Sequence, residues 1–319
     1  MVKDDTTEPY SYTFWNKEFL EQKNIIANLE AISYDELSNQ LIELDSKTKI
    51  GVIGFDDLVD SCFKIVCSIP VLLVAVDVPY LVRCRPNEPK QIFTNPAELS
   101  YNPFQERIDY GRFNLKREPI FYAVTPSESL NSYPEELASI YETCKDLKKA
   151  DTVILENRHV TVSYWKVSKP FYAVVLSLYD DGINKNLTLQ NMNLFFESIF
   201  ENKFTTESRK IISTLYKYLS SKASSIKESN NDYLITTAFR HALEKYYAHE
   251  IKALIYSGAD SDNNCINIAL TKNTVDEKFI EFDKAIIYEI MTARRIHPLT
   301  GFSFPFGKDY FMFNLNKKY

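Results

Sequence analysis

The sequence predicts an α+β fold in which a helical N-terminal region precedes a mixture of strands and helices. Three observations predict it. The 319 residues are 45% hydrophobic and 25% charged, a composition typical of a globular chain that can bury a sizeable core. Helical spacing dominates the first part of the chain, and strand-like runs begin only near residue 71. The later elements lack the regular βαβ alternation of a doubly wound parallel sheet.

Residues 14–48 predict the N-terminal helices. Apolar residues recur there at roughly helical spacing, namely Phe19, Leu20, Ile25, Ile26, Leu29 and Ile32. Ser33 stands three residues before Glu36, which is the pattern of a capping box at the start of a second helix. Residues 1–75 contain no catalytic combination of side chains, so we expect them to form a packing layer or to face a partner.

The apolar run from Ile65 to Val76 predicts a buried element and no membrane span. It is 12 residues long, whereas a spanning helix requires about 20. The first thirty residues show no basic-then-apolar signal pattern, and the five cysteines are an odd number without paired CxxC spacing. We therefore expect a soluble, cytoplasmic protein with reduced cysteines.

Short runs rich in β-branched and aromatic residues predict the strands. They are VLLVAV at 71–76, YLVRCR at 80–85, IFYAV at 120–124, TVILE at 152–156, FYAVVLSL at 171–178, IKALIYS at 251–257 and CINIAL at 265–270. Arg83 and Arg85 alternate within the second run. We therefore expect both arginines on one face of the strand, with Val82 and Cys84 on the other.

Stretches with helical spacing lie between these runs, at 134–149, 190–200, 206–221 and 232–247. Pro134 in the first turn, followed by two glutamates, suits a helix N-terminus. One face of this first helix carries Leu137, Ile140, Cys144 and Leu147. The polar segment 220–232 predicts a surface loop.

The C-terminal segment from Thr300 is rich in aromatic residues and lacks interleaved basic ones, so it predicts a core-packing pair of strands and no base-stacking platform. These patterns divide the chain into three parts. We expect a helical region at 1–75, a catalytic region at 76–275, and a C-terminal extension at 276–319 that packs on the catalytic region.

The composition argues against several classes of function. Seven glycines occur, far below the roughly 22 of average usage, and Gly51 and Gly54 do not make a dinucleotide or P-loop fingerprint. The formal net charge of −6 argues against direct binding of nucleic acid. The four histidines show no ligand spacing, so the sequence predicts no metal site.

Arg83, Arg85 and Arg112 are candidates for binding an anion. A guanidinium group suits bidentate contact with phosphate or carboxylate. Gly111, directly before Arg112, would let a ligand approach the backbone closely. For any one of these arginines alone, a salt bridge or a solvated edge strand is the simpler interpretation.

Three other side chains have simple structural interpretations when taken alone. Glu142 lies roughly 140° from Leu137 around the helix, which places it off the apolar stripe as an exposed acid. Tyr122 is explained as a core aromatic. Ser257, beside Gly258, is explained as a turn residue at a strand end.

The order of the motifs is more specific than any single residue. LVRCRP, YGRFN, EPIFYAVTPSES, ASIYETCK and ALIYSGADSDNNCINIAL follow one another along the chain. This series resembles the RES domain family, named for an arginine, a glutamate and a serine, over about residues 80–275. The resemblance implies an ADP-ribosyltransferase-like fold of mixed sheets with flanking helices. It also implies a toxin that destroys cellular NAD and is restrained by a helix-turn-helix antitoxin.

The resemblance assigns the arginines to the cofactor. Arg83 matches the family's first arginine, and Arg112 matches the second, within a Gly-Arg-x-Asn pattern. Arg85 is a further candidate. The pyrophosphate of NAD carries two negative charges, and arginines can bind it without a glycine-rich helix terminus. We therefore expect these three residues to bind NAD, with Arg83 also part of the catalytic set.

The remaining assignments concern the reacting end of NAD. Glu142 matches the helix glutamate, and its charge would stabilise the oxocarbenium-like sugar as the nicotinamide leaves. Tyr122 matches an aromatic that can stack on nicotinamide. Ser257 is the nearest candidate for the serine that hydrogen-bonds the amide or a ribose hydroxyl, although a gapless alignment places Gly258 there.

The expected function is therefore an NAD-consuming enzyme that cleaves the bond between nicotinamide and ribose, without a metal. The acceptor of the sugar, whether water, phosphate or a side chain, stays open. Two other functions stay open as well. One is an ADP-ribosyltransferase acting on a macromolecule, and the other is an inactive RES-like domain that binds a nucleotide or a partner.

Overall fold

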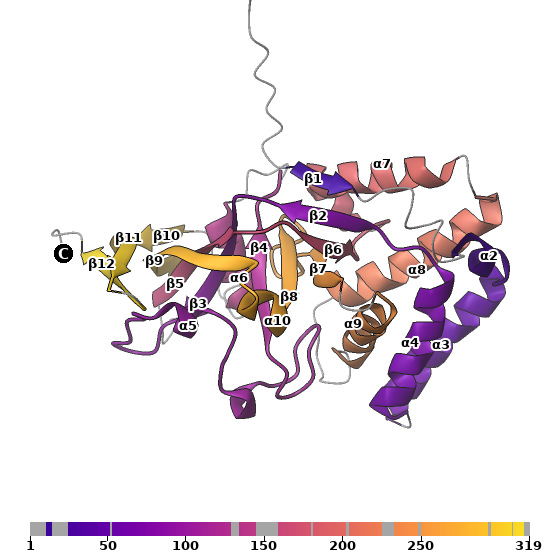
Figure 1. Cartoon of the computed structure of the whole chain (residues 1–319), viewed down its shortest axis with the longest axis horizontal. Coiled ribbons are helices and arrows are strands. Elements are labelled where there is room, and N and C mark those ends of the chain that lie inside the picture. The colour runs from indigo at the N-terminus through magenta and orange to yellow at the C-terminus, as the bar shows by residue number, and fades with distance from the viewer. Residues whose placement is uncertain are drawn as a thin grey trace, which may run out of the picture.

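The computed structural model describes residues 11–14, 25–51, 53–128, 134–144, 159–179, 181–201, 204–224, 233–247, 250–292, 295–307 and 309–315. Within these residues, ten strands form one mixed sheet (Figure 1). Their order is β1 (Ser11–Phe14), β2 (Leu73–Asp77), β6 (Phe171–Val175), β7 (Ile251–Ser257), β8 (Ile266–Thr271), β4 (Ile120–Thr125), β3 (Tyr80–Pro86), β5 (His159–Val167), β9 (Ile280–Thr292) and β10 (Arg295–Pro298). The predicted α+β class, with a helical region near the N-terminus, is confirmed.

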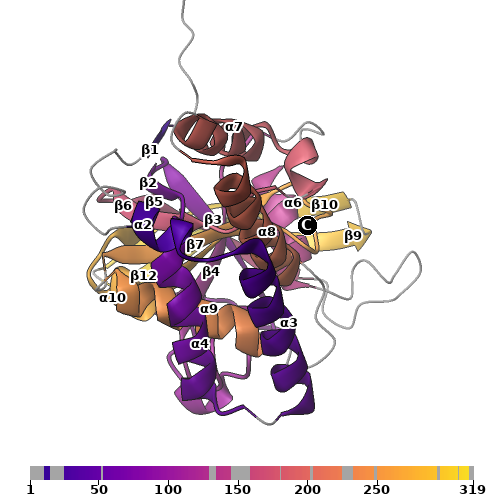
Figure 2. The ribbon, with the colours of Figure 1, turned by 90° about the vertical axis from the view of Figure 1, so that its right-hand side faces the viewer.

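The helices fall into an N-terminal group and a later group. The N-terminal group is α2 (Ile25–Glu30), α3 (Tyr34–Ile50) and α4 (Phe55–Ser68). The later group is α5 (Pro96–Leu99), α6 (Glu135–Thr143), α7 (Leu187–Glu201), α8 (Thr206–Ser224), α9 (Leu234–Tyr246) and α10 (Lys272–Asp276). α3 and α4 pack against α8 and α9, so the N-terminal helices stand at one end of the molecule (Figures 1 and 2). Among the described helices, none has the length and apolarity that crossing a membrane requires.

The predicted start of α3 is confirmed. The Oγ of Ser33 accepts a hydrogen bond from the backbone N of Glu36 at 3.2 Å. Gly51 ends the same helix in the left-handed conformation, with φ of 71°, which favours glycine. The apolar run from Ile65 to Val76 forms two elements, because α4 ends at Ser68 and β2 begins at Leu73.

The strand predictions for most runs are confirmed. The runs at 71–76, 80–85, 120–124, 171–178, 251–257 and 265–270 correspond to β2, β3, β4, β6, β7 and β8. The predicted strand at 152–156, the helix beyond residue 144 and most of the loop at 220–232 lie outside the described residues. β5 and β9 were not predicted, and they pair with each other along most of their length. The sheet thus takes strands from residues 1–75, 76–275 and 276–319 alike.

The sheet is nearly divided between β3 and β4. These strands share a single register pair, Val82 with Val124, whereas β3 pairs with β5 along its whole length and β4 pairs with β8 along its own. Beyond Val82 the two strands therefore separate. α6 lies against both strands near this separation.

The C-terminal strand pair is confirmed as β11 (Thr300–Phe306) and β12 (Tyr310–Leu315), which form an antiparallel hairpin. Phe311 packs into the core, with its ring stacked on Phe282 at 4.7 Å. The opposite face of the hairpin leaves large side chains exposed, including Phe304 and Met312.

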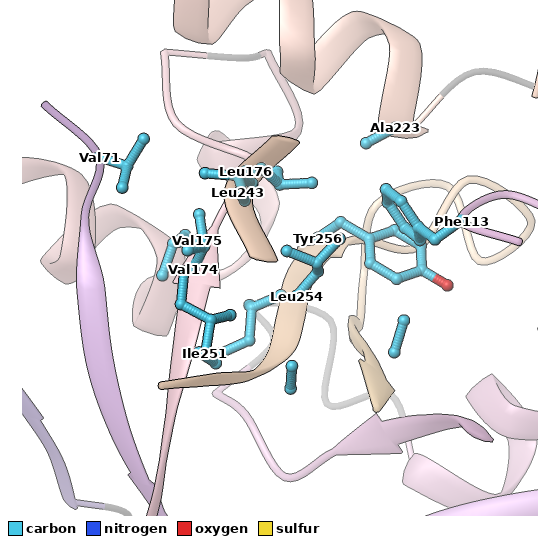
Figure 3. Packing of buried hydrophobic residues seen from close by; sticks show 14 of the residues in the cluster. Val71, Phe113, Val174, Val175, Leu176, Ala223, Leu243, Ile251, Leu254 and Tyr256 are labelled. Carbon is cyan, nitrogen blue, oxygen red and sulfur yellow. The ribbon is translucent and has the colours of Figure 1, made fainter. Parts of the chain in front are cut away.

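The main core lies between the sheet and the helices α7, α8 and α9. Figure 3 shows Val174, Val175 and Leu254 from the parallel strands β6 and β7 meeting side chains from the helices. At one edge of this cluster the rings of Phe113 and Tyr256 meet edge to face, with centroids 4.9 Å apart. This contact fixes the loop before β4 against β7.

Candidate active site

A cleft of about 310 Å³ opens where β3 and β4 separate. This volume lies at the lower end of the range for ligand pockets, roughly 300 to 1,000 Å³. The side chains that can carry chemistry there are those of Arg83, Arg85, Tyr110, Arg112, Tyr122, Glu142, Tyr233, Tyr256, Asp260 and Asn267. Segments far apart in the sequence thus meet at one hollow. Five of the six predicted site residues line it, and Ser257 does not.

Arg83 and Arg85 project from β3 as the alternation predicted, while Val82 and Cys84 are buried in the core. Both guanidinium groups donate to backbone carbonyls. Arg83 donates from Nε to Leu99 O at 3.1 Å and from its terminal nitrogen to Tyr122 O, which bridges the separated strands. Arg85 donates to the carbonyl that follows Leu99, just after α5.

These two arginines have no carboxylate partner among the described residues. Burial, together with the neighbouring charge of Arg85, lowers the pKa of Arg83 to about 9. Burial also lowers the pKa of Arg85, whose Nε has no hydrogen-bond partner. Two adjacent cations in this setting favour the binding of an anion, because a buried charge is costly until it is paired.

Arg112 is positioned by a tight turn. The backbone groups of Gly111 and Asn114 exchange hydrogen bonds of 3.1 and 3.3 Å across it. A Cβ on Gly111 would lie 2.2 Å from Asn114 Oδ1, so only glycine fits. The guanidinium of Arg112 donates to Ala223 O and lies 5.7 Å from the ring centroid of Tyr256. The turn therefore places Arg112 in the lining of the cleft, beside Tyr256.

The hydroxyl of Tyr122 stabilises the turn before β4, a role that the sequence did not predict. Its hydroxyl accepts a hydrogen bond from Phe113 N and donates one to Asn114 Oδ1, both at 2.9 Å. Burial raises the pKa of this hydroxyl, which keeps it protonated as a donor. The Tyr122 hydroxyl thus stabilises the turn that carries Arg112, and Tyr122 also lines the cleft.

Glu142 is a partly buried acid of α6 that faces the sheet and the loop after β7. Its Oε1 accepts from Ser261 N at 2.7 Å, and its Oε2 accepts from Asn267 Nδ2 at 2.8 Å. Burial and the charge of Asp260 raise its pKa, and both hydrogen bonds oppose that rise. The interpretation of Glu142 as an exposed helical acid is wrong, because the loop from Gly258 covers it.

Ser257 points away from this cleft. It is fully buried, and its hydroxyl donates to Asn263 Oδ1 at 2.8 Å. Its backbone N donates to Ser177 Oγ at 2.7 Å. The structure therefore does not bring Ser257 to the other predicted site residues, and its neighbour Tyr256 lines the cleft in its place.

Sequence reasoning missed several lining residues. Asn267 carried a usable signal, since it is the one amide inside the apolar run CINIAL. Tyr256 lies directly opposite Asn267 in the β7–β8 register, so the two share a face of the sheet. Asp260 and Tyr233 carried no signal in the sequence. Asp260 follows β7 and Tyr233 precedes α9, and both lie in polar stretches that resemble ordinary loops.

The cleft combines three guanidinium groups with two carboxyl groups, Glu142 and Asp260. Such a site can hold an anionic ligand beside a group that becomes positively charged. Among the described residues, no group of three or more His, Cys, Asp or Glu side chains is placed to hold a metal ion. No protein-family model matches the chain, and no curated protein is found to be similar to it.

Proposed function

We propose that the chain is an NAD-consuming enzyme that cleaves the bond between nicotinamide and ribose. One observation carries the proposal. Arg83, Arg85 and Arg112, which lie on two separate segments, line the same cleft as the acid Glu142. This combination matches a substrate with an anionic pyrophosphate and a reaction that creates positive charge on a sugar.

The pyrophosphate is assigned to the arginines. Arg83 and Arg85 donate to carbonyl oxygens, which orients them but leaves their charges uncompensated by any described carboxylate. A bound diphosphate would supply the missing negative charge. Charge-assisted hydrogen bonds of this kind are roughly twice as strong as neutral ones. The lowered pKa of Arg83 would rise again when the anion binds, because the anion favours the charged guanidinium.

The reacting sugar is assigned to Glu142. As the nicotinamide leaves with the bonding electrons, C1′ of the ribose gains oxocarbenium character. A carboxylate fixed by Ser261 N and Asn267 needs no reorganisation to stabilise that charge. Burial raises the pKa of Glu142, yet the positive charge that develops on the sugar favours its ionised form.

The cellular setting follows from the same proposal. An enzyme that removes NAD acts where NAD is abundant, and the five cysteines stand as thiols, as in a reducing cytoplasm. A chain with this activity would harm its own cell unless a partner covered the cleft. The helix-turn-helix antitoxin implied by the resemblance to the RES domain family is the partner we propose.

The test is to incubate the purified protein with NAD and to quantify nicotinamide by chromatography. We expect nicotinamide release that Glu142→Gln reduces by at least about 100-fold. Glu135→Gln, on the same helix but outside the cleft, is the matched control and should keep full activity. Absence of nicotinamide release by the intact protein would overturn the proposal.

The same experiment separates the other candidate functions. Label from adenine-labelled NAD that stays on a macromolecule would identify a transferase. Tight binding of NAD in calorimetry without turnover would identify a binding domain.

A further inference from the structure

Asp260 is a carboxylate with no hydrogen-bond or ion-pair partner in the part of the chain that the structure describes. It is 5% exposed and lines the cleft that contains Glu142. It accepts no hydrogen bond and forms no ion pair with any residue that the structure describes. Since Asp260 lines the cleft and accepts no hydrogen bond there, its carboxylate oxygens can accept from a ligand group that donates to them.

The loop that carries Asp260 does not need this side chain for its own structure. Ser261 Oγ donates to Gly258 O at 3.1 Å, Asn263 N donates to Gly258 O at 2.8 Å, and Asn264 Nδ2 donates to Ser261 O at 2.8 Å. These bonds close the turn without Asp260. The side chain is therefore available for a task in the cleft.

The contrast with Glu142 defines that task. Glu142 receives two hydrogen bonds and is fixed beside the sugar position, whereas Asp260 receives none and keeps its full capacity to accept. The two acids are close enough that the charge of Asp260 raises the pKa of Glu142. Asp260 thus lies near Glu142 and accepts no hydrogen bond from the described residues. A carboxylate in this position is suited to removing a proton from an incoming nucleophile.

We propose that Asp260 forms the acceptor subsite and is the general base that activates water, an inference that rests on the proposed function. The C1′–N bond breaks, and neutral nicotinamide leaves with the electron pair. The oxygen of water forms a bond to C1′, and its proton passes to Asp260, which later releases it to solvent. The sum is NAD⁺ and water giving ADP-ribose, nicotinamide and one proton.

The charge of the subsite selects the class of nucleophile. Phosphate at neutral pH carries one to two negative charges and needs no base. Asp260 and Glu142 together would repel it from the acceptor side, since like charges in a site of low dielectric constant interact strongly. A neutral nucleophile such as water suffers no repulsion and gains from the base. The subsite therefore favours hydrolysis over phosphorolysis.

The experiment compares Asp260→Asn with Asp262→Asn, an exposed residue of the same loop. Asn is close in shape to Asp, so both variants should fold. We expect Asp260→Asn to lower kcat for hydrolysis by about 10²–10⁴-fold, which is the usual contribution of a general base, with KM for NAD little changed. Asp262→Asn should match the intact protein.

Restoration of activity by azide distinguishes a general base from a structural residue, because azide cannot repair a damaged fold. It is a nucleophile that needs no deprotonation, and removal of the Asp260 charge lets an anion enter. We expect azide to restore nicotinamide release by Asp260→Asn with formation of an azido-ADP-ribose, and to leave Glu142→Gln inactive. Mass spectrometry identifies the adduct.

The outcomes distinguish this inference from the proposed function. If the intact protein releases no nicotinamide, the proposed function fails. If the intact protein is active but Asp260→Asn is equally active, or is inactive and not restored by azide, only the role of Asp260 fails. Formation of ADP-ribose 1-phosphate as the main product in phosphate buffer would likewise overturn the acceptor assignment.

Discussion

Asn267 on β8 donates a hydrogen bond of 2.8 Å from its Nδ2 to Oε2 of Glu142 on α6. The bond joins the sheet to the helix across the cleft and connects residues 125 positions apart. It fixes the orientation of the carboxylate. It also opposes the rise in the pKa of Glu142 that burial and Asp260 cause. Asn267 is therefore a positioning residue for the acid.

Asn267→Ala should make the activity more sensitive to acid. Loss of a hydrogen bond to a charged group costs roughly 1.5–3 kcal/mol, and here it removes an interaction that opposes the rise in the pKa of Glu142. A raised pKa means that the carboxylate is protonated at higher pH. The acidic limb of the kcat profile for NAD cleavage should therefore move to higher pH. Asn273→Ala, on an exposed residue of α10, is the control, and an unmoved limb in Asn267→Ala would contradict the assigned role.

Gly258→Ser should destabilise the protein although it restores the serine at the position that a gapless match to the RES domain family indicates. A Cβ at this position would lie 2.4 Å from Ser261 Oγ, 2.5 Å from Cys265 Sγ and 2.6 Å from Glu142 Oε1. Such overpacking costs about 1–3 kcal/mol and displaces the acid. We expect a lower free energy of unfolding in urea and weaker NAD cleavage.

The matched control for this substitution is Gly54→Ser. Gly54 is the N-cap of α4, where serine is a favoured residue, and its nearest contact is the flexible side chain of Asp57 at 3.2 Å. We expect the stability of this variant to equal or exceed that of the intact protein. If both serines are tolerated equally, the close approach of Glu142 to Gly258 does not constrain the site.

Local patterns predicted the parts of the fold that local physics determines. The alternation in LVRCR placed Arg83 and Arg85 on one face because successive strand residues point to opposite sides. The pair Ser33 and Glu36 marked a helix start because the hydroxyl satisfies a backbone N–H. Neither inference required knowledge of distant residues.

The missed parts depend on long-range pairing. The alternation of His159, Thr161 and Ser163 with apolar residues was a usable strand signal for β5, but its place between β3 and β9 is set by pairing with distant segments. The prediction that Glu142 lies on a helix was correct. Its burial could not be predicted locally, because the loop that covers it lies more than 100 residues further along the chain. Ser257 was assigned by its motif, whereas the register of Tyr256 opposite Asn267 directs Ser257 to the other face.

Tyr122→Phe should loosen the turn that carries Arg112. The change removes the acceptor for Phe113 N and the donor for Asn114 Oδ1, two bonds of 2.9 Å. A buried polar group left without a partner costs about 1–3 kcal/mol. We expect a loss of that size in urea unfolding, together with a higher KM for NAD. Tyr101→Phe, which removes one exposed hydrogen bond to Asp276, should cost less than about 0.5 kcal/mol.

If KM for NAD stays unchanged in Tyr122→Phe, the hydrogen bonds of Tyr122 to the turn at 111–114 do not contribute to substrate binding. In that event the bond of Arg112 to Ala223 O and the burial of Phe113 hold Arg112 in place without the Tyr122 hydroxyl. The stability loss would then be the only effect of the missing hydroxyl.

Glu118 should make the stability depend on pH in the acidic range. Burial alone would raise its pKa, but the hydrogen bond from His241 and the charge of Arg240 lower it to about 2 from the ordinary 4.5. The ionised form is therefore favoured by folding. Its contribution to stability is complete above pH 4.5 and disappears as the pH falls from 4.5 toward 2.

Glu118→Gln tests this linkage because the difference in unfolding free energy between it and the intact protein isolates one carboxyl group. At pH 7 we expect the variant to be less stable by roughly 2–3 kcal/mol, and the difference should shrink steadily below pH 4.5. Glu277→Gln, whose acid is half exposed and paired with Lys252, should differ from the intact protein by less than about 1 kcal/mol at every pH. A difference for Glu118→Gln that is constant from pH 7 to pH 3 would show that the buried contact with Arg240 acts through packing and not through its charge.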